Sequence, residues 1–316
     1  MNRVWITGAG GMMGSHLIEM LSDNYEVFGS YFKPTIDLTE IKKYALREVN
    51  ITDWCSVFDF LQYFKPDSIF HLAAQSYLGV SWERPAETIT TNVIGMVNIC
   101  EAVRRLELKP CILAACTAAE YGYVPENEMP IKEDRELKPL QPYGVSKMAQ
   151  DFLAYQYHQN YGMNTIRARI FNCTGTRKIN DALSDFIRRA VDLERNIDQN
   201  ILRVGNLDTR RTIVDVRDLN NALVSLMENG KSGEVYNVGG DTVYVMKDIV
   251  ELILTKSKRK NIVVKQDSSL LRSTDESIIW GDTTRLKNDT QWRQTVTIEQ
   301  TIEDMFSYWR NKDFSL

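Results

Sequence analysis

The sequence predicts an α/β fold of the Rossmann type, a doubly wound parallel sheet joined to a smaller C-terminal α/β region. Three observations predict it. Short strand-like runs alternate with amphipathic helical stretches through the first half of the chain. The strand-like runs are almost continuously apolar, as expected of strands covered on both faces. A glycine-rich turn joins the first strand to the first helix within fifteen residues of the start.

The elements of the first half follow from this alternation. The expected strands are 4–7, 26–31, 69–73, 111–115 and 165–171. The expected helices are 13–22, 53–64, 87–106 and 143–161. Such an order places the helices on both faces of a parallel sheet.

The pattern changes after about Asn172. Helices are expected at 181–196, 218–229 (capped by Gly230), 246–256 and 298–310, and strands at 211–216 and 236–239. We therefore expect a first domain over 1–171, to whose sheet 212–239 returns. A second, smaller domain would consist of 172–211 and 240–316.

Composition excludes several classes of function. The chain has 316 residues, 43% of them hydrophobic and 25% charged, which is typical of a globular protein. Its net charge of −4 argues against nucleic acid or an acidic membrane as the main partner. No apolar stretch is long enough to span a bilayer, and the start has no signal region. Five cysteines without a C-x-x-C pair favour a reduced, cytoplasmic protein, and three histidines without ligand spacing predict no metal.

The glycine turn carries the first chemical signal. Gly8, Gly11 and Gly14, with Met12 and Met13 between them, allow a tight turn and a close approach of the backbone to a ligand. The free N–H groups of the following helix suit a pyrophosphate. Glycine turns alone are common, but the strand-turn-helix context predicts a dinucleotide site.

The end of the second strand bears on the choice of cofactor. An Asp or Glu there commonly binds the ribose 2′-hydroxyl of NAD. This chain has Tyr31 and Lys33 instead, and no carboxylate. Lys33 either neutralises a 2′-phosphate or is simply solvent-exposed. The cofactor is thus NAD(H) or NADP(H), with NADP favoured.

A second constellation follows the fourth apolar strand. Tyr143 and Lys147 stand four residues apart at the start of a helix, so both side chains share one face. A nearby ammonium stabilises a phenolate and makes tyrosine a usable acid or base. Thr117 offers a hydroxyl at the carboxyl edge of the sheet, where open α/β folds bind ligands; alternatively it bonds its own backbone in a turn.

Together these motifs resemble the extended short-chain dehydrogenase/reductase superfamily. The glycine turn, His71-Leu72-Ala73-Ala74-Gln75-Ser76, Thr117 and Tyr143-x-x-x-Lys147 carry the likeness. Within the superfamily the chain is similar to the GDP-mannose branch, which includes GDP-4-keto-6-deoxy-D-mannose reductases and the related GDP-mannose 4,6-dehydratases. The stretches that carry this finer likeness are 81–88, 92–95, 141–151, 203–207, 215–218, 233–238, 281–286 and 308–310.

The resemblance implies roles for particular residues. Thr117 would hold the sugar O4, Tyr143 would donate or remove its proton, and Lys147 would bind the nicotinamide ribose and tune Tyr143. The cofactor would also contact the glycine turn, Tyr31, Lys33, Asn50, Ile51, Leu72, Ala73 and Ala74. The GDP-linked sugar would contact Ser81, Trp82, Glu83, Thr117, Asn172, Arg211, Arg272 and Asp275. Without the family match, the two arginines would be read as surface ion pairs.

One departure from the family pattern separates the candidate reactions. The dehydratases have Thr-x-Glu at this place, and the glutamate abstracts the C5 proton; this chain has Thr117-Ala118-Ala119. Alanine moves no proton, and the adjacent Glu120 should point elsewhere. The epimerising relatives place a cysteine at the same offset, which Ala119 also excludes. Ala118 and Ala119 make room for a larger C5 substituent, as in a GDP-heptose.

The sequence therefore predicts an NAD(P)-dependent oxidoreductase acting at C4 of a GDP-mannose-type sugar, either a 4-keto-6-deoxy-mannose reductase or a GDP-heptose C4 enzyme. The first alternative is a GDP-mannose 4,6-dehydratase, disfavoured by Ala119. The second is a cofactor-sensing regulator without chemistry, against which the intact Thr117, Tyr143 and Lys147 argue. The resemblance also implies a homodimer paired through helices 87–106 and 143–161, or a tetramer.

Overall fold

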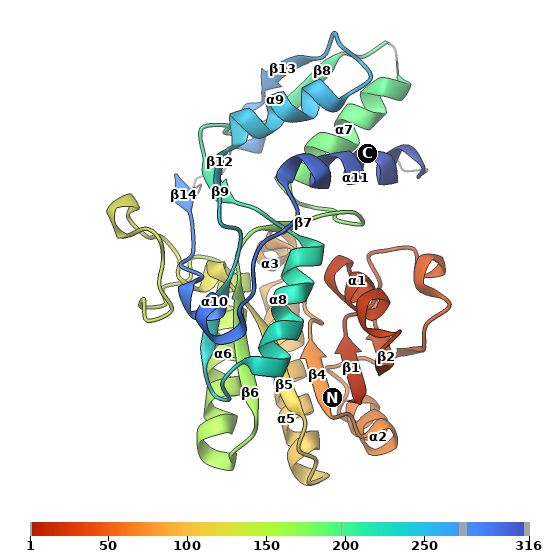
Figure 1. Cartoon of the computed structure of the whole chain (residues 1–316), viewed down its shortest axis with the longest axis vertical. Helices are drawn as coiled ribbons and strands as arrows, with labels where there is room; N and C mark the ends of the chain where they lie inside the picture. The colour runs from red at the N-terminus through yellow and green to blue at the C-terminus, as the bar shows by residue number, and fades with distance from the viewer. Residues whose placement is uncertain (1, 197, 272–276, 313–316) are drawn as a thin grey trace.

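A parallel sheet occupies the lower half of the molecule in the computed structural model, which describes residues 2–196, 198–271 and 277–312 (Figure 1). Within these ranges it has seven strands, in the order β3-β2-β1-β4-β5-β6-β11, all paired in parallel. Their bounds are β1 Arg3–Thr7, β2 Glu26–Tyr31, β3 Leu46–Glu48, β4 Ser68–His71, β5 Cys111–Thr117, β6 Thr165–Ile170 and β11 Val235–Val238. The predicted fold class is confirmed. The strand order reverses between β1 and β4, and ligands of such sheets bind at the carboxyl ends near this point.

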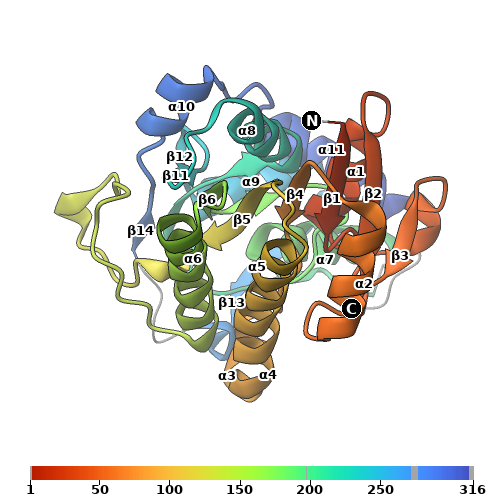
Figure 2. The same cartoon turned by 90° about the horizontal axis from the view of Figure 1, so that it is seen from below.

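Helices cover both faces of the sheet, as the view from below shows (Figure 2). One face carries α1 (Met12–Leu21) and α8 (Val216–Asn229), and the other carries α2 (Trp54–Phe64), α5 (Gly95–Arg105) and α6 (Pro142–Tyr161). Side chains of β1 alternate between the two cores: Val4 and Ile6 pack toward α1 and α8, and Trp5 packs toward α2 and α5. The apolar runs of the sequence are explained by this two-sided burial.

The expected single helix over 87–106 is wrong in detail. The structure has α4 (Pro85–Ile89), a π-helical turn η2 (Thr90–Ile94) and then α5. The side chain of Asn92 is fully buried in that turn and hydrogen-bonds Gln75 and Ser146, so a local interruption turns a polar group inward. Single π turns of this kind are frequent at functional sites.

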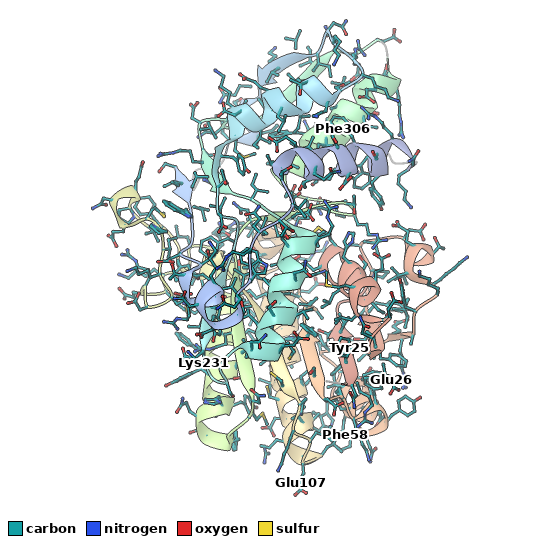
Figure 3. The ribbon with its side chains drawn as sticks, viewed as in Figure 1. Tyr25, Glu26, Phe58, Glu107, Lys231 and Phe306 are labelled. Carbon is teal, nitrogen blue, oxygen red and sulfur yellow. The ribbon has the colours of Figure 1, made fainter. Side chains whose placement is uncertain are left out.

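The upper part of the molecule has a core of its own. The helices α7 (Ala182–Arg195), α9 (Met246–Lys256) and α11 (Ile298–Arg310) enclose it, and Phe306 of α11 lies inside (Figure 3). A parallel pair, β8 (Ile201–Val204) and β13 (Val263–Gln266), lies at the top. Asp181 begins α7 with a side chain that accepts from the N–H of Ser184, a reciprocal cap.

Short strands connect the two parts. The expected strand 211–216 is divided between β9 and β10, because β9 pairs with β12 and β14 whereas β10 pairs with β7. The bounds of the remaining elements are β7 Cys173–Thr174, β9 Arg210–Thr212, β10 Val214–Asp215, β12 Val243–Val245, β14 Ile278–Ile279, α3 Leu78–Glu83, α10 Thr284–Thr290, η1 Leu38–Ile41, η3 Ala118–Glu120, η4 Glu126–Glu128 and η5 Ser268–Leu270. Nowhere in the described ranges does a helix have the length and apolarity needed to cross a membrane.

Candidate active site

A large cleft of about 1620 Å³ runs along the carboxyl edge of the sheet and under the upper part. Its floor comes from the glycine turn after β1, the ends of β2, β4, β5 and β6, and the start of α6. Its roof comes from the start of α7 and from β9. All predicted cofactor residues lie on its wall: Gly8, Gly11, Met12, Met13, Gly14, Tyr31, Lys33, Asn50, Ile51, Leu72, Ala73, Ala74, Tyr143 and Lys147.

The glycine turn brings bare backbone to the cleft. Gly8 has φ +74°, and a Cβ there would lie 2.8 Å from the backbone nitrogen of Ala73. At Gly11 a Cβ would have only the Gly8 carbonyl oxygen and the Thr35 hydroxyl within 4 Å, so this position opens into the cleft. Gly11 is also the N-cap of α1, whose first N–H groups follow it. This cradle fits a pyrophosphate.

The loop after β4 is fixed by a buried histidine. The Nδ1 atom of His71 lies 3.0 Å from the hydroxyl of Thr7, and that hydroxyl accepts the N–H of Ala73 at 3.0 Å. Burial, and next the charge of Lys147, lower the pKa of His71 to about 3, so the ring is neutral. The apolar wall of Leu72, Ala73 and Ala74 is thereby fixed against the glycine turn.

Charges gather at the end of the cleft beyond β2. The Nζ atom of Lys33 lies 3.4 Å from Glu87 Oε1, and Glu87 Oε2 lies 3.4 Å from Arg84. Two cations therefore share one carboxylate. Asn50 accepts the N–H of Thr52 at 3.1 Å, which shapes the turn beside Ile51.

Thr117, Tyr143 and Lys147 come together at the centre of the cleft. The hydroxyl of Thr117 accepts the N–H of Ala119 at 3.3 Å, as the turn interpretation expected, and it also hydrogen-bonds the Tyr143 side chain. Pro142 at the first position of α6 begins the helix here, and the next residue, Tyr143, faces Thr117. The structure thus places the hydroxyl and the phenol side by side.

Lys147 is the buried cation of this group. It is 2% exposed, and its ammonium donates to the carbonyl of Ala115 at 2.8 Å and to Gln150 Oε1 at 2.9 Å. Burial lowers the pKa of Lys147 to about 8. Burial also raises the pKa of Tyr143, an effect that the hydrogen bond from Thr117 opposes. An isolated buried phenol is a weak acid, and the hydroxyl of Thr117 is the neighbouring group that lowers the pKa of Tyr143.

The wall beyond Thr117 is apolar. Ala118 and Ala119 line the cleft, and a cluster of apolar side chains continues from them. Its members on the cleft wall are Val124, Met129, Ile131, Phe171 and Ile279. The carboxyl of Glu120 is fully buried and does not line the cleft. The expectation that Glu120 points elsewhere agrees with this placement.

The predicted substrate residues divide into three groups. Glu83, Thr117, Asn172 and Arg211 line the cleft. Ser81 and Trp82 do not: the buried Ser81 hydroxyl donates to the Leu78 carbonyl at 2.7 Å, and Trp82 is 59% exposed. A six-residue helix, α3, turns these two away from the cleft. Arg272 and Asp275 lie outside the described residues.

Two cleft features escaped the sequence reasoning. Gln75 lines the cleft and exchanges hydrogen bonds with Asn92, which lies in the π turn. Arg177, also on the wall, bonds Glu19 and Glu40 at 2.8–3.0 Å and so ties α1 and η1 to the loop before α7. The signals for Asn92 were a polar residue inside an apolar helical pattern and its place in the stretch of family likeness 92–95.

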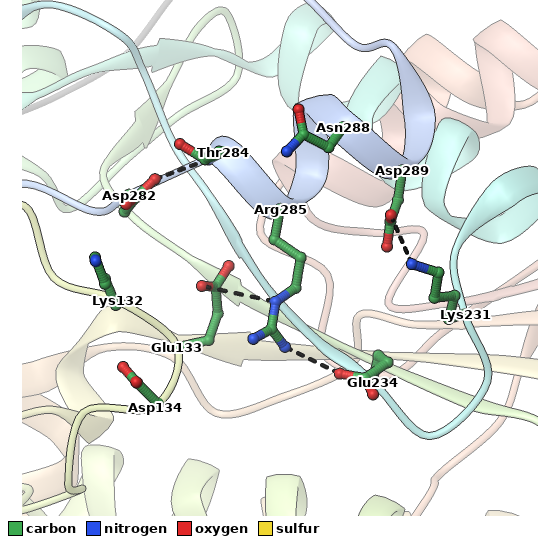
Figure 4. Close-up of a pocket in the computed structure, with 10 residues that line it drawn as sticks. All are labelled: Lys132, Glu133, Asp134, Lys231, Glu234, Asp282, Thr284, Arg285, Asn288 and Asp289. Atoms are coloured by element: carbon green, nitrogen blue, oxygen red, sulfur yellow. Dashed lines mark hydrogen bonds and ion pairs between the residues drawn. The ribbon is translucent and has the colours of Figure 1, made fainter.

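A second, smaller hollow of about 550 Å³ lies away from this cleft (Figure 4). Arg285 lies between Glu133 and Glu234, with its NH1 atom 2.9 Å from Glu234. Lys231 pairs with Asp289 at 2.8 Å. Carboxylates outnumber cations in the lining, and the hollow contains none of the predicted site residues.

The comparisons with known proteins decide the family. The family model described as GDP-mannose 4,6 dehydratase matches residues 5–305. The chain belongs to this family. It is 28% identical over 313 residues to the GDP-6-deoxy-D-mannose reductase of Pseudomonas aeruginosa, covering 98% of both chains. It is 27% identical over 310 residues to the GDP-6-deoxy-D-talose 4-dehydrogenase of Aggregatibacter actinomycetemcomitans, covering 96% of this chain and 97% of that one.

A solved structure of a family relative has the same fold over nearly its whole length. The structure of RMD from Pseudomonas aeruginosa complexed with NADPH matches with a TM-score of 0.86 and 27% identity. The match covers 98% of this chain and 99% of that one.

Proposed function

We propose that the protein is an NAD(P)-dependent oxidoreductase that acts at C4 of a GDP-linked sugar. The observation that carries this is the grouping of Thr117, Tyr143 and Lys147 in the main cleft, next to the glycine turn. The names of its relatives, a GDP-6-deoxy-D-mannose reductase and a GDP-6-deoxy-D-talose 4-dehydrogenase, support the same reaction at the same carbon.

In the reducing direction the chain must bind a C4 ketone and protonate its oxygen. The nicotinamide cofactor, when bound, supplies the hydride that reaches C4. Thr117 and Tyr143 hold O4 by hydrogen bonds, and Tyr143 gives its hydroxyl proton to O4 as negative charge develops there. The ammonium of Lys147 stabilises the phenolate that remains. Oxidation of a C4 alcohol uses the same groups with the proton moving back to Tyr143.

The nicotinamide cofactor fits the cradle of Gly8 and Gly11, and NADP is the form that we propose. The pair of cations Lys33 and Arg84 around Glu87 supports this choice, because a 2′-phosphate would compensate the excess positive charge. The relative of known structure is complexed with NADPH. Residues 1–171, together with 212–239, would hold the cofactor, and 172–211 with 240–316 would hold the sugar nucleotide.

The sugar that we favour is a 4-keto-6-deoxy-mannose rather than a heptose. The cleft wall beyond Ala118 consists of Val124, Met129, Ile131 and other apolar side chains. Such a wall stabilises a methyl group, whereas the hydroxyls of a heptose side chain would lose hydrogen bonds to water there. Asn172 and Arg211 would bind the GDP half, and Arg272 and Asp275 remain predicted partners of it.

A homodimer in the cytoplasm completes the proposal. Exposed apolar side chains lie on the helices predicted to pair: Ile89, Ile94, Val145, Phe152, Tyr155 and Tyr161. Covering such a patch by a second copy is favourable. A tetramer would need a further surface.

The proposal is tested by incubating the protein with GDP-4-keto-6-deoxy-mannose, a GDP-4-keto-heptose and NADPH, followed by mass spectrometry of the products. We expect a gain of two hydrogens on the 6-deoxy sugar, dependent on NADPH. Absence of reduction with every 4-keto sugar would contradict the proposed activity.

A further inference from the structure

A fully buried carboxyl group lies directly behind the proposed active site. The backbone N–H of Thr117 donates to Glu120 Oε1 at 2.8 Å, while the Thr117 side chain faces Tyr143 in the cleft. Glu120 is 0% exposed. The carboxyl of Glu120 thus holds the backbone of the residue whose hydroxyl is to hold O4.

The second oxygen of this carboxyl has no donor. Glu120 Oε2 receives no hydrogen bond from any residue in the described ranges, although it is buried. Arg169 Nε lies 3.5 Å away, but its hydrogen points to Asp151 Oδ2, which it bonds at 2.9 Å. An ionised carboxylate at Glu120 would therefore leave half of its charge unsolvated, which is costly in a buried site.

Asp151, in contrast, is well supplied with donors. Its Oδ1 accepts from Arg167 at 2.8 Å and its Oδ2 from Arg169, so it is the ionised member of the pair. The two carboxyl groups lie within 4.8 Å of each other. A proton on Glu120 Oε2 turns their repulsion into attraction.

Further titratable side chains face Glu120 from the elements packed against it. Tyr143 and Lys147 belong to α6, and Cys116 belongs to β5. Tyr121 is the residue that follows Glu120 in the chain. Burial, and next the charge of Asp151, raise the pKa of Glu120 well above its usual range. An ionised Glu120 would in turn raise the pKa of Tyr143.

We propose that Glu120 is a positioning residue that stays protonated at neutral pH. In this state it fixes the backbone of Thr117 without placing a second buried negative charge beside the Tyr143 phenol. The inference rests on the proposed function, since Thr117 and Tyr143 take their roles from it. A metal is not needed to explain the cluster of Cys116, Glu120 and Asp151, because both oxygens of Asp151 already accept from guanidinium groups.

Two substitutions distinguish a protonated Glu120 from an ionised one. Glu120→Gln keeps an acceptor for the Thr117 N–H and replaces the acid proton by an amide donor toward Asp151. We expect it to retain kcat within about threefold of wild type. Glu120→Ala removes the acceptor and should lower kcat by about 10- to 100-fold while the KM for the cofactor changes little. Equal losses of kcat in the two variants would overturn the proposal.

A matched control separates positioning from plain stability. Asp218 is also fully buried and accepts the backbone N–H groups of Thr295 and Val296 at 2.9 and 2.7 Å, but it lies away from the cleft. Asp218→Ala should lower the free energy of unfolding without lowering the kcat of the folded protein. If Glu120→Ala behaves in the same way, Glu120 has only a structural role.

The protonation state is measured without turnover. The infrared difference spectrum of wild type minus Glu120→Gln at pH 7 should contain the carbonyl band of a protonated carboxylic acid, and its absence would show an ionised Glu120. In the folded state Glu120 keeps its proton, whereas in the unfolded chain it releases that proton above about pH 4.3. The free energy of unfolding of wild type should therefore fall, relative to Glu120→Gln, as the pH rises from there. These readouts remain valid even if the reaction differs from the one proposed, whereas inactivity of the wild type on all 4-keto sugars would count against the function alone.

Discussion

The backbone N–H of Thr117 donates a 2.8 Å hydrogen bond to the carboxyl of Glu120, three residues further along the chain. This bond points the only carboxylate of the 117–120 segment into the core and leaves Ala118 and Ala119 on the cleft wall. A C5 proton of a bound sugar would therefore meet methyl groups where a lyase needs a base.

The first prediction concerns the lyase alternative. GDP-mannose incubated with the protein and catalytic cofactor should yield no 4-keto-6-deoxy product, because the Ala119 side chain has no group that can accept or donate a proton. A missing general base slows such a step by about 10²-fold or more. The measurement is mass spectrometry for the loss of one water. Stoichiometric loss of water would show that the protein is a dehydratase.

The second prediction concerns the acid. Tyr143→Phe should keep cofactor affinity and lose turnover by about 10²–10⁴-fold, because the phenol proton is the one delivered to O4. Cofactor fluorescence titration and steady-state rates together check it. Turnover within tenfold of wild type would show that another group protonates O4.

The third prediction concerns pH. Burial lowers the pKa of Lys147 to about 8, so the side chain loses its positive charge as the pH rises through that value. The phenolate formed at Tyr143 then loses its stabilising cation, and kcat in the reducing direction should fall above about pH 8. Rates with both ligands saturating measure this. A rate that stays constant well above pH 8 would contradict the role of Lys147.

The fourth prediction concerns the choice of cofactor. Lys33→Ala should raise the Kd of NADPH by about tenfold and leave the Kd of NADH almost unchanged. The reason is that only NADPH carries a 2′-phosphate to pair with the ammonium. Glu87→Gln is the matched variant: it removes the carboxylate that competes for Lys33 and should strengthen NADPH. Equal effects of Lys33→Ala on the two cofactors would rule out the phosphate contact.

The fifth prediction concerns the sugar nucleotide. Arg211→Ala should raise the Kd of the GDP-sugar by about tenfold or more, through loss of a charge-assisted contact, and spare the cofactor. Arg203→Ala is the control, since Arg203 is exposed, lies off the cleft wall and pairs with Asp267. Calorimetric titration of each ligand separately checks both variants; parallel weakening of both ligands by Arg211→Ala would indicate misfolding.

Long periodic segments were predictable from sequence, and short ones were not. The helices 246–256 and 298–310 have the predicted bounds, because their apolar residues keep the helical period. The strand 26–31 also has the predicted bounds. The exposed strand β13 was missed, since none of its four residues is buried and no apolar pattern marks it. The helix 87–106 was overextended, because the period of its apolar residues hides the π turn at Asn92.

In the site, too, residues marked by local spacing were predictable and residues placed by tertiary packing were not. The glycine turn and Tyr143-x-x-x-Lys147 follow from local spacing, so the sequence reasoning placed their residues on the cleft wall correctly. Ser81 and Trp82 were expected in the cleft through a stretch of family likeness, but the orientation of the short helix α3 cannot be read from spacing. The pairing of Glu120 with Asp151, 31 positions apart, depends on tertiary packing of α6 against β5 and has no local signature.

The transfer of deuterium from the cofactor to the sugar is the sharpest test of the proposed reaction. The protein is incubated with GDP-4-keto-6-deoxy-mannose and NADPH that carries deuterium at both hydrogen positions of the nicotinamide C4, and the product is analysed by NMR. We expect one deuterium at the sugar C4, in amounts equal to the cofactor oxidised, and none when Tyr143→Phe replaces the wild type. Deuterium at any other carbon, or cofactor oxidation without labelled sugar, would contradict it.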